Sequence, residues 1–139
     1  MNSNVCIFCR IAEGNIPSQK VYENKDFIAF LDINPLREGH VQVIPKKHYR
    51  WVWDVPNVGE YFETCQKVAN ALRKTFNTEH VVSLVFGEEV PHAHIWLVPR
   101  TPDDGHGGSI NLGLRSKPST EELTKVAERI EKNMNNQDR

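Results

Sequence analysis

Hydrophobic residues along the chain gather in short runs separated by polar turns, with one long segment of helical periodicity among them. Four apolar runs have the length of strands and are bounded by turn-forming residues. They are Phe27–Leu31, Val41–Ile44, Val81–Phe86 and His92–Val98. Between the first pair and the second pair, residues 58–76 predict an amphipathic helix. The residues at helical spacing on its expected core face are Phe62, Cys65, Ala69, Leu72 and Phe76.

A second helix is predicted near the C-terminus. It begins near Ser119, where Ser-Thr-Glu-Glu can form a capping box after Pro118. Its expected apolar face consists of Leu123, Val126, Ala127 and Ile130. The glycine-rich segment 103–113 predicts a loop. We therefore expect one α+β domain with a mostly antiparallel sheet, one long central helix and a C-terminal helix. Its expected parts are a core over residues 1–115, the C-terminal helix over 116–133 and a frayed tail over 134–139.

The segment 91–100 carries the most distinctive pattern of the chain, because apolar residues alternate in it with histidine and tryptophan. In a strand every second side chain lies on the same face. The residues expected to face the core are Ala93, Ile95 and Leu97, and those expected on the opposite, accessible face are His92, His94 and Trp96. Two imidazoles about 7 Å apart can carry nucleophilic, proton-transfer or metal chemistry. The alternative is an ordinary strand whose outer face carries polar rings.

Composition excludes several classes of function. The 139 residues suit one domain with one hydrophobic core. A formal net charge of −1 and a pI near 6.6 give no electrostatic basis for binding nucleic acid or an acidic membrane. No apolar run is long enough to span a bilayer, and the N-terminus lacks the apolar segment of a signal peptide. The three cysteines form no secreted disulfide framework, and Cys65 is expected to be a small buried hydrophobe, so we expect a cytoplasmic protein.

Six short motifs occur in the order typical of one protein family. They are Cys6–Ser18 (CIFCRIAEGNIPS), Val21–Glu23, Phe27–Pro35 (FIAFLDINP), Gly39-His40, Val43–His48 (VIPKKH) and His92-x-His94 with its trailing Pro99-Arg100. Each motif alone is weak, but the ordered set is very specific. On these residues the chain resembles the histidine triad (HIT) superfamily, especially its bacterial branch, over most of its length. The resemblance implies a HIT-like fold, nucleotide binding, transfer or hydrolysis of nucleotidyl groups, and a homodimer.

The resemblance also implies a covalent mechanism centred on His94. Its imidazole would attack the α-phosphorus of a nucleotide conjugate and form a nucleotidyl-histidine, which water or another acceptor then cleaves. The other ring nitrogen of such a nucleophile needs an acceptor that fixes its tautomer, often a backbone carbonyl. His40 matches the family's active-site histidine on the neighbouring strand, where it could contact His94 or the phosphate. The alternative for His40 is a solvated histidine at the start of a strand.

The family's nucleoside pocket would lie across the first strands. Asp32 matches the carboxylate that accepts hydrogen bonds from the ribose hydroxyls. The residues that match apolar positions around the base are Ile33, Phe30, Phe8 and Ile11. An ordinary core role is the alternative for them, above all for Phe8 and Phe30. An apolar pocket with one orienting carboxylate fits small-ligand sites in general and says little about which base is bound.

Cys6 and Cys9 form a C-x₂-C motif, which supplies two ligands of a structural zinc site from one tight turn. The resemblance implies that His48 and His92 complete the site, as in some bacterial HIT proteins and the related galactose-1-phosphate uridylyltransferases. His92 would then be structural, and His94 would be the only catalytic histidine of the strand. One alternative is a redox dithiol, although such motifs usually open a helix after a strand. The other alternative is a pair of plain reduced thiols.

Three positions depart from the family pattern. Trp96 stands where the third histidine of the triad offers a polar group to the phosphate or leaving group, and an indole has only one N–H donor. Gly87-Glu88-Glu89 replaces the usual Gly-Gln-Ser, so Glu89 would lie beside the bound phosphate. Carboxylates there repel an anion unless they face away or pair with a cation. The polar loop before Gly87 is shortened to Leu84–Phe86.

These matches and departures leave two classes of function open. One is a HIT-type enzyme that acts through His94 on a nucleoside phosphoramidate or dinucleoside polyphosphate, with a leaving group that prefers the aromatic wall of Trp96. The other is a nucleotide-binding or signalling module with weakened catalysis and a structural zinc site. Retention of His94, His40 and Asp32 favours the enzyme. Loss of the third histidine and of the phosphate-binding Gln-Ser favours the binding module.

Overall fold

The computed structural model describes residues 6–137, which form a five-stranded sheet, three α-helices and one short 3₁₀-helix. Their order and bounds are α1 (Ile7–Ala12), β1 (Lys20–Glu23), β2 (Phe27–Leu31), β3 (Val41–Pro45), the 3₁₀-helix (Val52–Asp54), α2 (Val58–Thr75), β4 (Val81–Leu84), β5 (Ile95–Pro99) and α3 (Thr120–Gln137). The strands lie in the order β1-β2-β3-β5-β4, and every neighbouring pair is antiparallel. The predicted α+β fold is confirmed.

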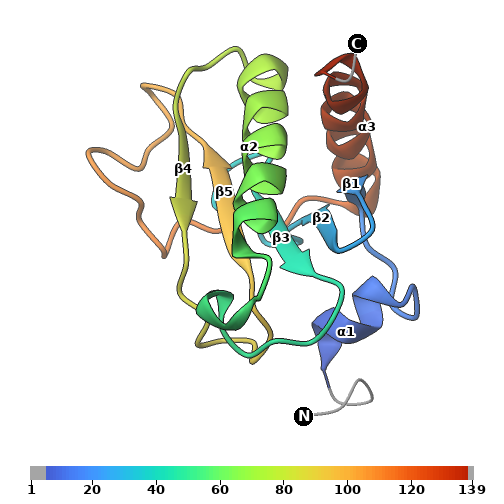
Figure 1. The fold of residues 1–139 in the computed structure, drawn as a ribbon. Helices are drawn as coiled ribbons and strands as arrows, with labels where there is room; N and C mark the ends of the chain where they lie inside the picture. Colours follow the sequence, from blue (N-terminus) through green and yellow to red (C-terminus); the bar gives the residue numbers. More distant parts are fainter. Residues whose placement is uncertain (1–5, 138–139) are drawn as a thin grey trace.

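Helices α2 and α3 lie side by side and pack on one face of the sheet (Figure 1). The core between these helices and the sheet contains Phe27, Ala29 and Leu31 of β2 and Val41 and Val43 of β3, because side chains alternate between the two faces of a strand. Ala93, Ile95 and Leu97 join the same core. The predicted inward direction of these three residues is therefore confirmed.

The opposite face of the sheet is covered by α1 and by the loop over residues 100–119. One apolar cluster there consists of Cys6, Phe8, Cys9, Ile28, Phe30 and Ile44. A second cluster joins Trp96, Leu36 and Val98 to Val82, Leu84 and Ile110. His92, His94 and Trp96 are only 0%, 3% and 5% exposed, so the expectation of an accessible face was wrong. The alternation gives the side on which these rings lie, but it says nothing of the segments that cover them.

Helix α3 is longer than the sequence pattern predicted. Its capping box is confirmed, because the Glu122 amide donates to Ser119 Oγ at 3.1 Å and the Ser119 amide donates to Glu122 Oε1 at 3.2 Å. The helix continues to Gln137, and Met134 adds a buried side chain to its apolar face. The prediction that the helix ends at residue 133 and is followed by a frayed tail was therefore wrong for residues 134–137. Residues 138–139 lie outside the described part of the chain.

Helix α2 has almost the predicted bounds, but its buried side is rotated. Cys65 and Leu72 are buried as expected, whereas Phe62 is 41% exposed and Tyr61 is fully buried. Tyr61 stacks on Phe27 with ring centroids 4.8 Å apart, and its hydroxyl donates to the carbonyl of Val43 at 2.6 Å. An aromatic ring with a polar group is buried when that group finds a partner, which the spacing of apolar residues does not reveal.

The remaining differences concern short elements. β4 ends at Leu84 rather than at residue 86, and β5 begins at Ile95 rather than at His92. Helix α1, strand β1 and the 3₁₀-helix were not predicted, because each has at most six residues and is too short to show a repeating hydrophobic pattern. Within residues 6–137, no helix combines the length and the apolar character that crossing a membrane requires.

Candidate functional site

The predicted site residues come together on the sheet face opposite α2 and α3. Phe30, Gln42 and Trp96 pair in register across β2, β3 and β5, so they form one row of side chains. His94 precedes β5 on one side of this row, whereas Asp32 follows β2 and His40 precedes β3 on the other side. Three antiparallel strands thereby bring residues distant in the sequence into one site.

The ring of His94 is fixed in one tautomer by the backbone. Its Nδ1 lies 2.8 Å from the carbonyl oxygen of His92, and because a carbonyl only accepts, Nδ1 carries the proton. Burial lowers the pKa of His94, although the same hydrogen bond opposes this shift, so the neutral ring is favoured. Among residues 6–137 no hydrogen bond involves Nε2. A neutral imidazole with its Nε2 lone pair available is the form that a nucleophile requires.

The carboxylate of Asp32 is buried and held on both oxygens. Oδ1 accepts from the Asn34 amide at 2.8 Å, and Oδ2 accepts from Gln42 Nε2 at 3.0 Å. Arg115 Nη1 lies 3.5 Å from Oδ2. Burial raises the pKa of Asp32, whereas the Asn34 amide, Arg115 and Gln42 all lower it. Gln42 was not predicted as a site residue, although it lies on β3 two residues after His40 and therefore on the same face.

His40 lies beside Asp32 and Trp96. Its Nδ1 accepts from the Leu36 amide at 3.1 Å, so the neutral ring carries its proton on Nε2. Nε2 lies 3.8 Å from Asp32 Oδ2, and the ring meets Trp96 edge to face at 5.0 Å. Burial lowers the pKa of His40 to about 3, with a smaller contribution from Arg115. His40 is therefore a fully buried, neutral N–H donor, and no ring contact with His94 occurs within residues 6–137.

Several buried polar atoms of the site have no partner in the described part of the chain. They are His40 Nε2, Gln42 Oε1 and Trp96 Nε1. Most buried polar groups in folded proteins are hydrogen-bonded, and unpaired ones call for an explanation such as a bound ligand or water. The three atoms offer two donors and one acceptor between His94 and Asp32. This is the chemistry of a site that takes a polar ligand.

Three of the four apolar residues predicted around the base lie in one cluster, and α1 supplies two of them. Phe8 meets the ring of His94 edge to face at 5.3 Å and the ring of Phe30 at 5.7 Å. Ile11 is half-buried against the same cluster, whereas Ile33 is 68% exposed. Phe8 and Phe30 are thus part of a core cluster and also border the site.

The two carboxylates at positions 88 and 89 do not enter the site as buried groups. Both Glu88 and Glu89 are exposed. The charge of Glu89 nevertheless raises the pKa of His94, as a smaller effect that opposes burial. Arg50 opposes Glu89 at the same ring and donates to the Gly87 carbonyl at 2.6 Å. An acidic and a basic group therefore have opposite effects on the pKa of His94.

A cluster of four potential metal ligands lies beside Phe8. It consists of Cys6, Cys9, His48 and His92. Their ligand atoms all lie within 4.8 Å of one another, with Cys6 Sγ 3.2 Å from His92 Nδ1 and Cys9 Sγ 3.3 Å from His48 Nδ1. His92 Nε2 donates to the carbonyl of Pro45 at 2.9 Å, which leaves the Nδ1 lone pair facing the thiols. Two sulfur and two nitrogen donors at this separation can hold a metal ion. Cys6 also caps α1, so the motif does open a helix.

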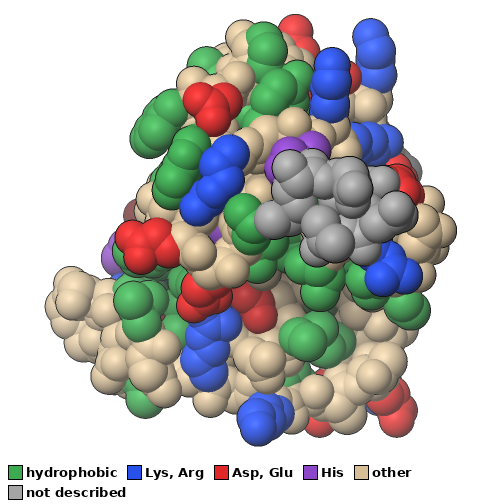
Figure 2. Space-filling model, turned by 90° about the horizontal axis from the view of Figure 1, so that it is seen from below, with side chains coloured by type: hydrophobic (Ala, Val, Ile, Leu, Met, Phe, Trp, Pro, Cys, Tyr) green, Lys and Arg blue, Asp and Glu red, His purple; other side chains and the backbone are tan. Residues whose placement is uncertain are grey.

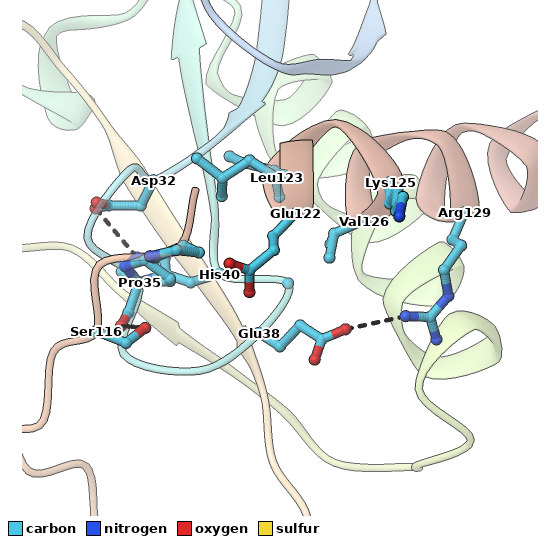
Figure 3. Close-up of a pocket in the computed structure, with 13 residues that line it drawn as sticks. Asp32, Pro35, Glu38, His40, Ser116, Glu122, Leu123, Lys125, Val126 and Arg129 are labelled. Atoms are coloured by element: carbon cyan, nitrogen blue, oxygen red, sulfur yellow. Dashed lines mark hydrogen bonds and ion pairs between the residues drawn. The ribbon is translucent and has the colours of Figure 1, made fainter. Parts of the chain in front are cut away.

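A cavity of about 430 Å³ borders the site through Asp32 and His40. Figure 3 shows Leu123 and Val126 of α3 on one side of it and an ion pair between Glu38 and Arg129 at one end. Neither His94 nor Trp96 lines this cavity. His94, the residue suited to covalent chemistry, therefore lies outside this cavity, on the face of the sheet opposite α2 and α3.

Charged side chains are mixed on the face seen from below. In Figure 2, Lys and Arg side chains are interspersed with Asp and Glu, and histidine shows among hydrophobic groups. Among the described residues visible on this face, no continuous basic stripe occurs, which is the electrostatic pattern that favours a nucleic-acid backbone.

Comparison with known sequences identifies the family. The sequence model of the HIT domain matches residues 13–103, which is well over half of the chain. The chain belongs to the HIT domain family. A HIT-like protein of Methanocaldococcus jannaschii is 39% identical over 107 residues, which cover 73% of this chain and 83% of that protein.

Two further HIT relatives carry names that describe an activity. The adenosine 5'-monophosphoramidase of Saccharomyces cerevisiae is 38% identical over 68% of this chain and 62% of its own length. The adenylylsulfatase of Arabidopsis thaliana is 30% identical over 94% of this chain and 70% of its own length. HIT proteins similar to this chain therefore include nucleotide hydrolases.

The fold is also that of solved HIT structures. A zinc-bound histidine triad family protein from Mycobacterium smegmatis superposes with a TM-score of 0.83 at 26% identity, over 99% of this chain and 98% of that protein. The HIT-like fold expected from the sequence is confirmed.

Proposed function

We propose that this HIT protein is a nucleotidyl hydrolase or transferase that acts at an α-phosphate through a nucleotidyl-histidine on His94. The observation that carries the proposal is the hydrogen bond from His94 Nδ1 to the His92 carbonyl at 2.8 Å. This bond directs the proton away from Nε2, so the lone pair needed for attack on phosphorus is available at neutral pH. Splitting one displacement into two lowers the barrier of each step.

The remaining site residues bind and orient the substrate in this proposal. Asp32 accepts hydrogen bonds from the ribose, and Ile33, Phe30, Phe8 and Ile11 surround the base. The N–H groups of His40 and Trp96, which have no partner within residues 6–137, donate to phosphate oxygens. Glu89 borders the phosphate from the exposed side. The names of two HIT relatives, an adenosine 5'-monophosphoramidase and an adenylylsulfatase, support the proposed type of reaction.

Replacing Asp32 tests the nucleoside site. Asp32→Ala removes a buried charged acceptor, so we expect binding of adenosine or guanosine monophosphate to weaken by about 1–3 kcal/mol. Isothermal titration calorimetry measures the change. Asp103→Ala is the matched control, because Asp103 is an exposed carboxylate in the loop after β5. Equal affinities of the wild-type and Asp32→Ala proteins would place the ribose elsewhere.

We further propose that the metal is a structural zinc ion held by Cys6, Cys9, His48 and His92. Burial raises the pKa of the Cys9 thiol to about 12, and the neighbouring Cys6 adds to this effect. A bound cation offsets the cost of ionising such thiols. The zinc-bound HIT protein of similar fold supports the choice of metal. We also expect a homodimer, on the family resemblance, with nucleotides rather than nucleic acid or membranes as the ligands.

A nucleotide-binding module with weakened catalysis is the second candidate, and one observation favours it. Trp96 fills the position of the third histidine, and its indole can donate a hydrogen bond but cannot exchange a proton.

Restoring the family triad separates these candidates. Trp96→His should raise kcat on a nucleoside phosphoramidate by about 10-fold or more, because a placed proton donor contributes about 10²–10⁴-fold and the nearby carboxylates cancel part of the gain. Trp96→Phe, which restores no donor, is the control. Steady-state kinetics of both variants provide the comparison. No turnover in the wild-type and Trp96→His proteins, with nucleotide binding intact, would favour the binding module.

A further inference from the structure

The guanidinium of Arg115 reaches from the loop over residues 100–119 back across the site. Its Nη1 donates to the carbonyl of Asn34 at 3.0 Å and lies 3.5 Å from Asp32 Oδ2. Its Cζ lies 4.9 Å from the centroid of the Trp96 ring. The loop thus places a positive charge beside both Asp32, the carboxylate proposed to bind the ribose, and Trp96, which occupies the position of the third triad histidine.

Trp96 makes this position favourable for an arginine. The indole ring has the strongest cation–π attraction of the aromatic side chains, whereas a histidine that becomes protonated repels a guanidinium. Among residues 6–137, Asn34 is the only hydrogen-bond acceptor of Arg115. Its side chain is 29% exposed, so the other N–H groups remain available to a ligand.

The loop that carries Arg115 is anchored close to the site. His106 Nε2 donates to the carbonyl of Leu36 at 2.9 Å, and His106 Nδ1 accepts from the Asn111 amide at 3.0 Å. The Ser116 amide donates to the carbonyl of Pro35 at 3.1 Å, one residue after Arg115. The bonds to Leu36 and Pro35 join the loop to the turn between β2 and β3, which also contains Asp32. Arg115 is therefore held in place before a ligand arrives, which reduces the entropy lost on binding.

The chemistry of positions 96 and 115 distinguishes between two classes of leaving group. An amine leaves a phosphoramidate readily only when a general acid protonates it, and the indole of Trp96 cannot supply that proton. A phosphate or sulfate leaves as a stable anion, which needs no proton but is stabilised by a positive charge. Arg115 supplies the charge, and the buried Trp96 N–H, which has no partner within residues 6–137, supplies a further donor.

We propose, resting on the proposed chemistry at His94, that Arg115 held on Trp96 is a substrate-binding residue that selects nucleotide conjugates with an oxyanion leaving group. His94 Nε2 forms a bond to the α-phosphorus while the bond from phosphorus to the bridging oxygen breaks. The electron pair stays on the departing phosphate or sulfate, which leaves without a proton beside Arg115. Water then attacks the same phosphorus, the P–N bond breaks, the electron pair returns to Nε2 and a proton passes to solvent.

Binding of a non-hydrolysable probe tests the contact itself. In α,β-methylene-ADP the second phosphate occupies the place of the leaving group, whereas adenosine carries no charge. Arg115→Gln should weaken binding of α,β-methylene-ADP by about 10- to 100-fold and change adenosine binding by less than about threefold, as measured by calorimetry. The affinity of Arg115→Lys for α,β-methylene-ADP should lie between those of the wild-type and Arg115→Gln proteins. Arg73→Gln on the exposed side of α2 is the matched control and should change neither affinity.

Turnover tests the selection. Adenosine 5'-phosphosulfate and adenosine 5'-phosphoramidate share the α-phosphate and differ in the leaving group. In Arg115→Gln the ratio of kcat/KM for the phosphosulfate to kcat/KM for the phosphoramidate should fall by about 10-fold or more. An unchanged ratio, or unchanged binding of α,β-methylene-ADP, would overturn the role of Arg115. Wild-type protein that binds neither adenosine nor α,β-methylene-ADP would contradict the proposed function itself. If it binds the probe without turning over either substrate, the binding comparison still decides whether Arg115 contacts the second phosphate.

Discussion

His94→Ala should reduce turnover of adenylylated substrates by at least about 10³-fold and change nucleotide affinity by less than about 10-fold. The variant removes the ring whose Nδ1 is bonded to the His92 carbonyl and whose Nε2 is available for attack. Steady-state kinetics on the phosphosulfate and the phosphoramidate, together with calorimetry on adenosine monophosphate, measure the two quantities.

The control for this variant is His80→Ala, because His80 is an exposed histidine before β4. It should retain full activity. Substantial turnover by His94→Ala would exclude the covalent mechanism. If the wild-type protein is inactive but binds nucleotides at this site, the protein is a binding module.

Removal of the metal should lower the thermal stability of the protein strongly. Purified protein should contain about one zinc ion per chain, and a chelator should lower Tm by about 10 °C or more, because metal bound only by the folded state adds to the free energy of unfolding. Metal analysis and differential scanning calorimetry provide these values. The effect is expected to be large because the ligands join the start of α1 to the segments after β3 and before β5.

Cysteine variants test whether the loss of thermal stability comes from this cluster. Cys9→Ala should lose both the zinc and the response to chelator. Cys65→Ala should keep both, because Cys65 lies on the buried side of α2 and outside the cluster. Protein purified without chelator that contains no zinc and melts at the same temperature with and without chelator would contradict the metal assignment.

The longer elements could be predicted from hydrophobic periodicity because each buries one face. Helix α3 shows the limit of the method, since its predicted end at residue 133 missed the turn that buries Met134. Helix α1 could not be predicted, because its six residues are too few to show a repeating hydrophobic pattern and its burial depends on contact with Ile28, Phe30 and Ile44. The burial of His94 was missed because it also depends on α1, whose Phe8 contacts the His94 ring.

The candidate site was only partly predictable. His94, His40 and Asp32 were expected from the family resemblance that the ordered motifs carry, and the structure brings them to one face of the sheet. Gln42 could have been found from the alternation on β3, which places it on the same face as His40. Arg115 could not, because its position depends on a loop anchored by His106 and on the Trp96 ring, and neither contact has a signature in the local sequence.

Trapping the covalent intermediate tests the central claim most directly. The protein is mixed with adenosine 5'-phosphosulfate and quenched within the first turnovers, and intact-mass spectrometry with peptide mapping then locates any adduct. We expect the mass of one adenylyl group on His94 in the wild-type protein and none in His94→Ala. Steady turnover without an adduct on His94, or an adduct on another residue that persists in His94→Ala, would contradict the nucleotidyl-histidine mechanism.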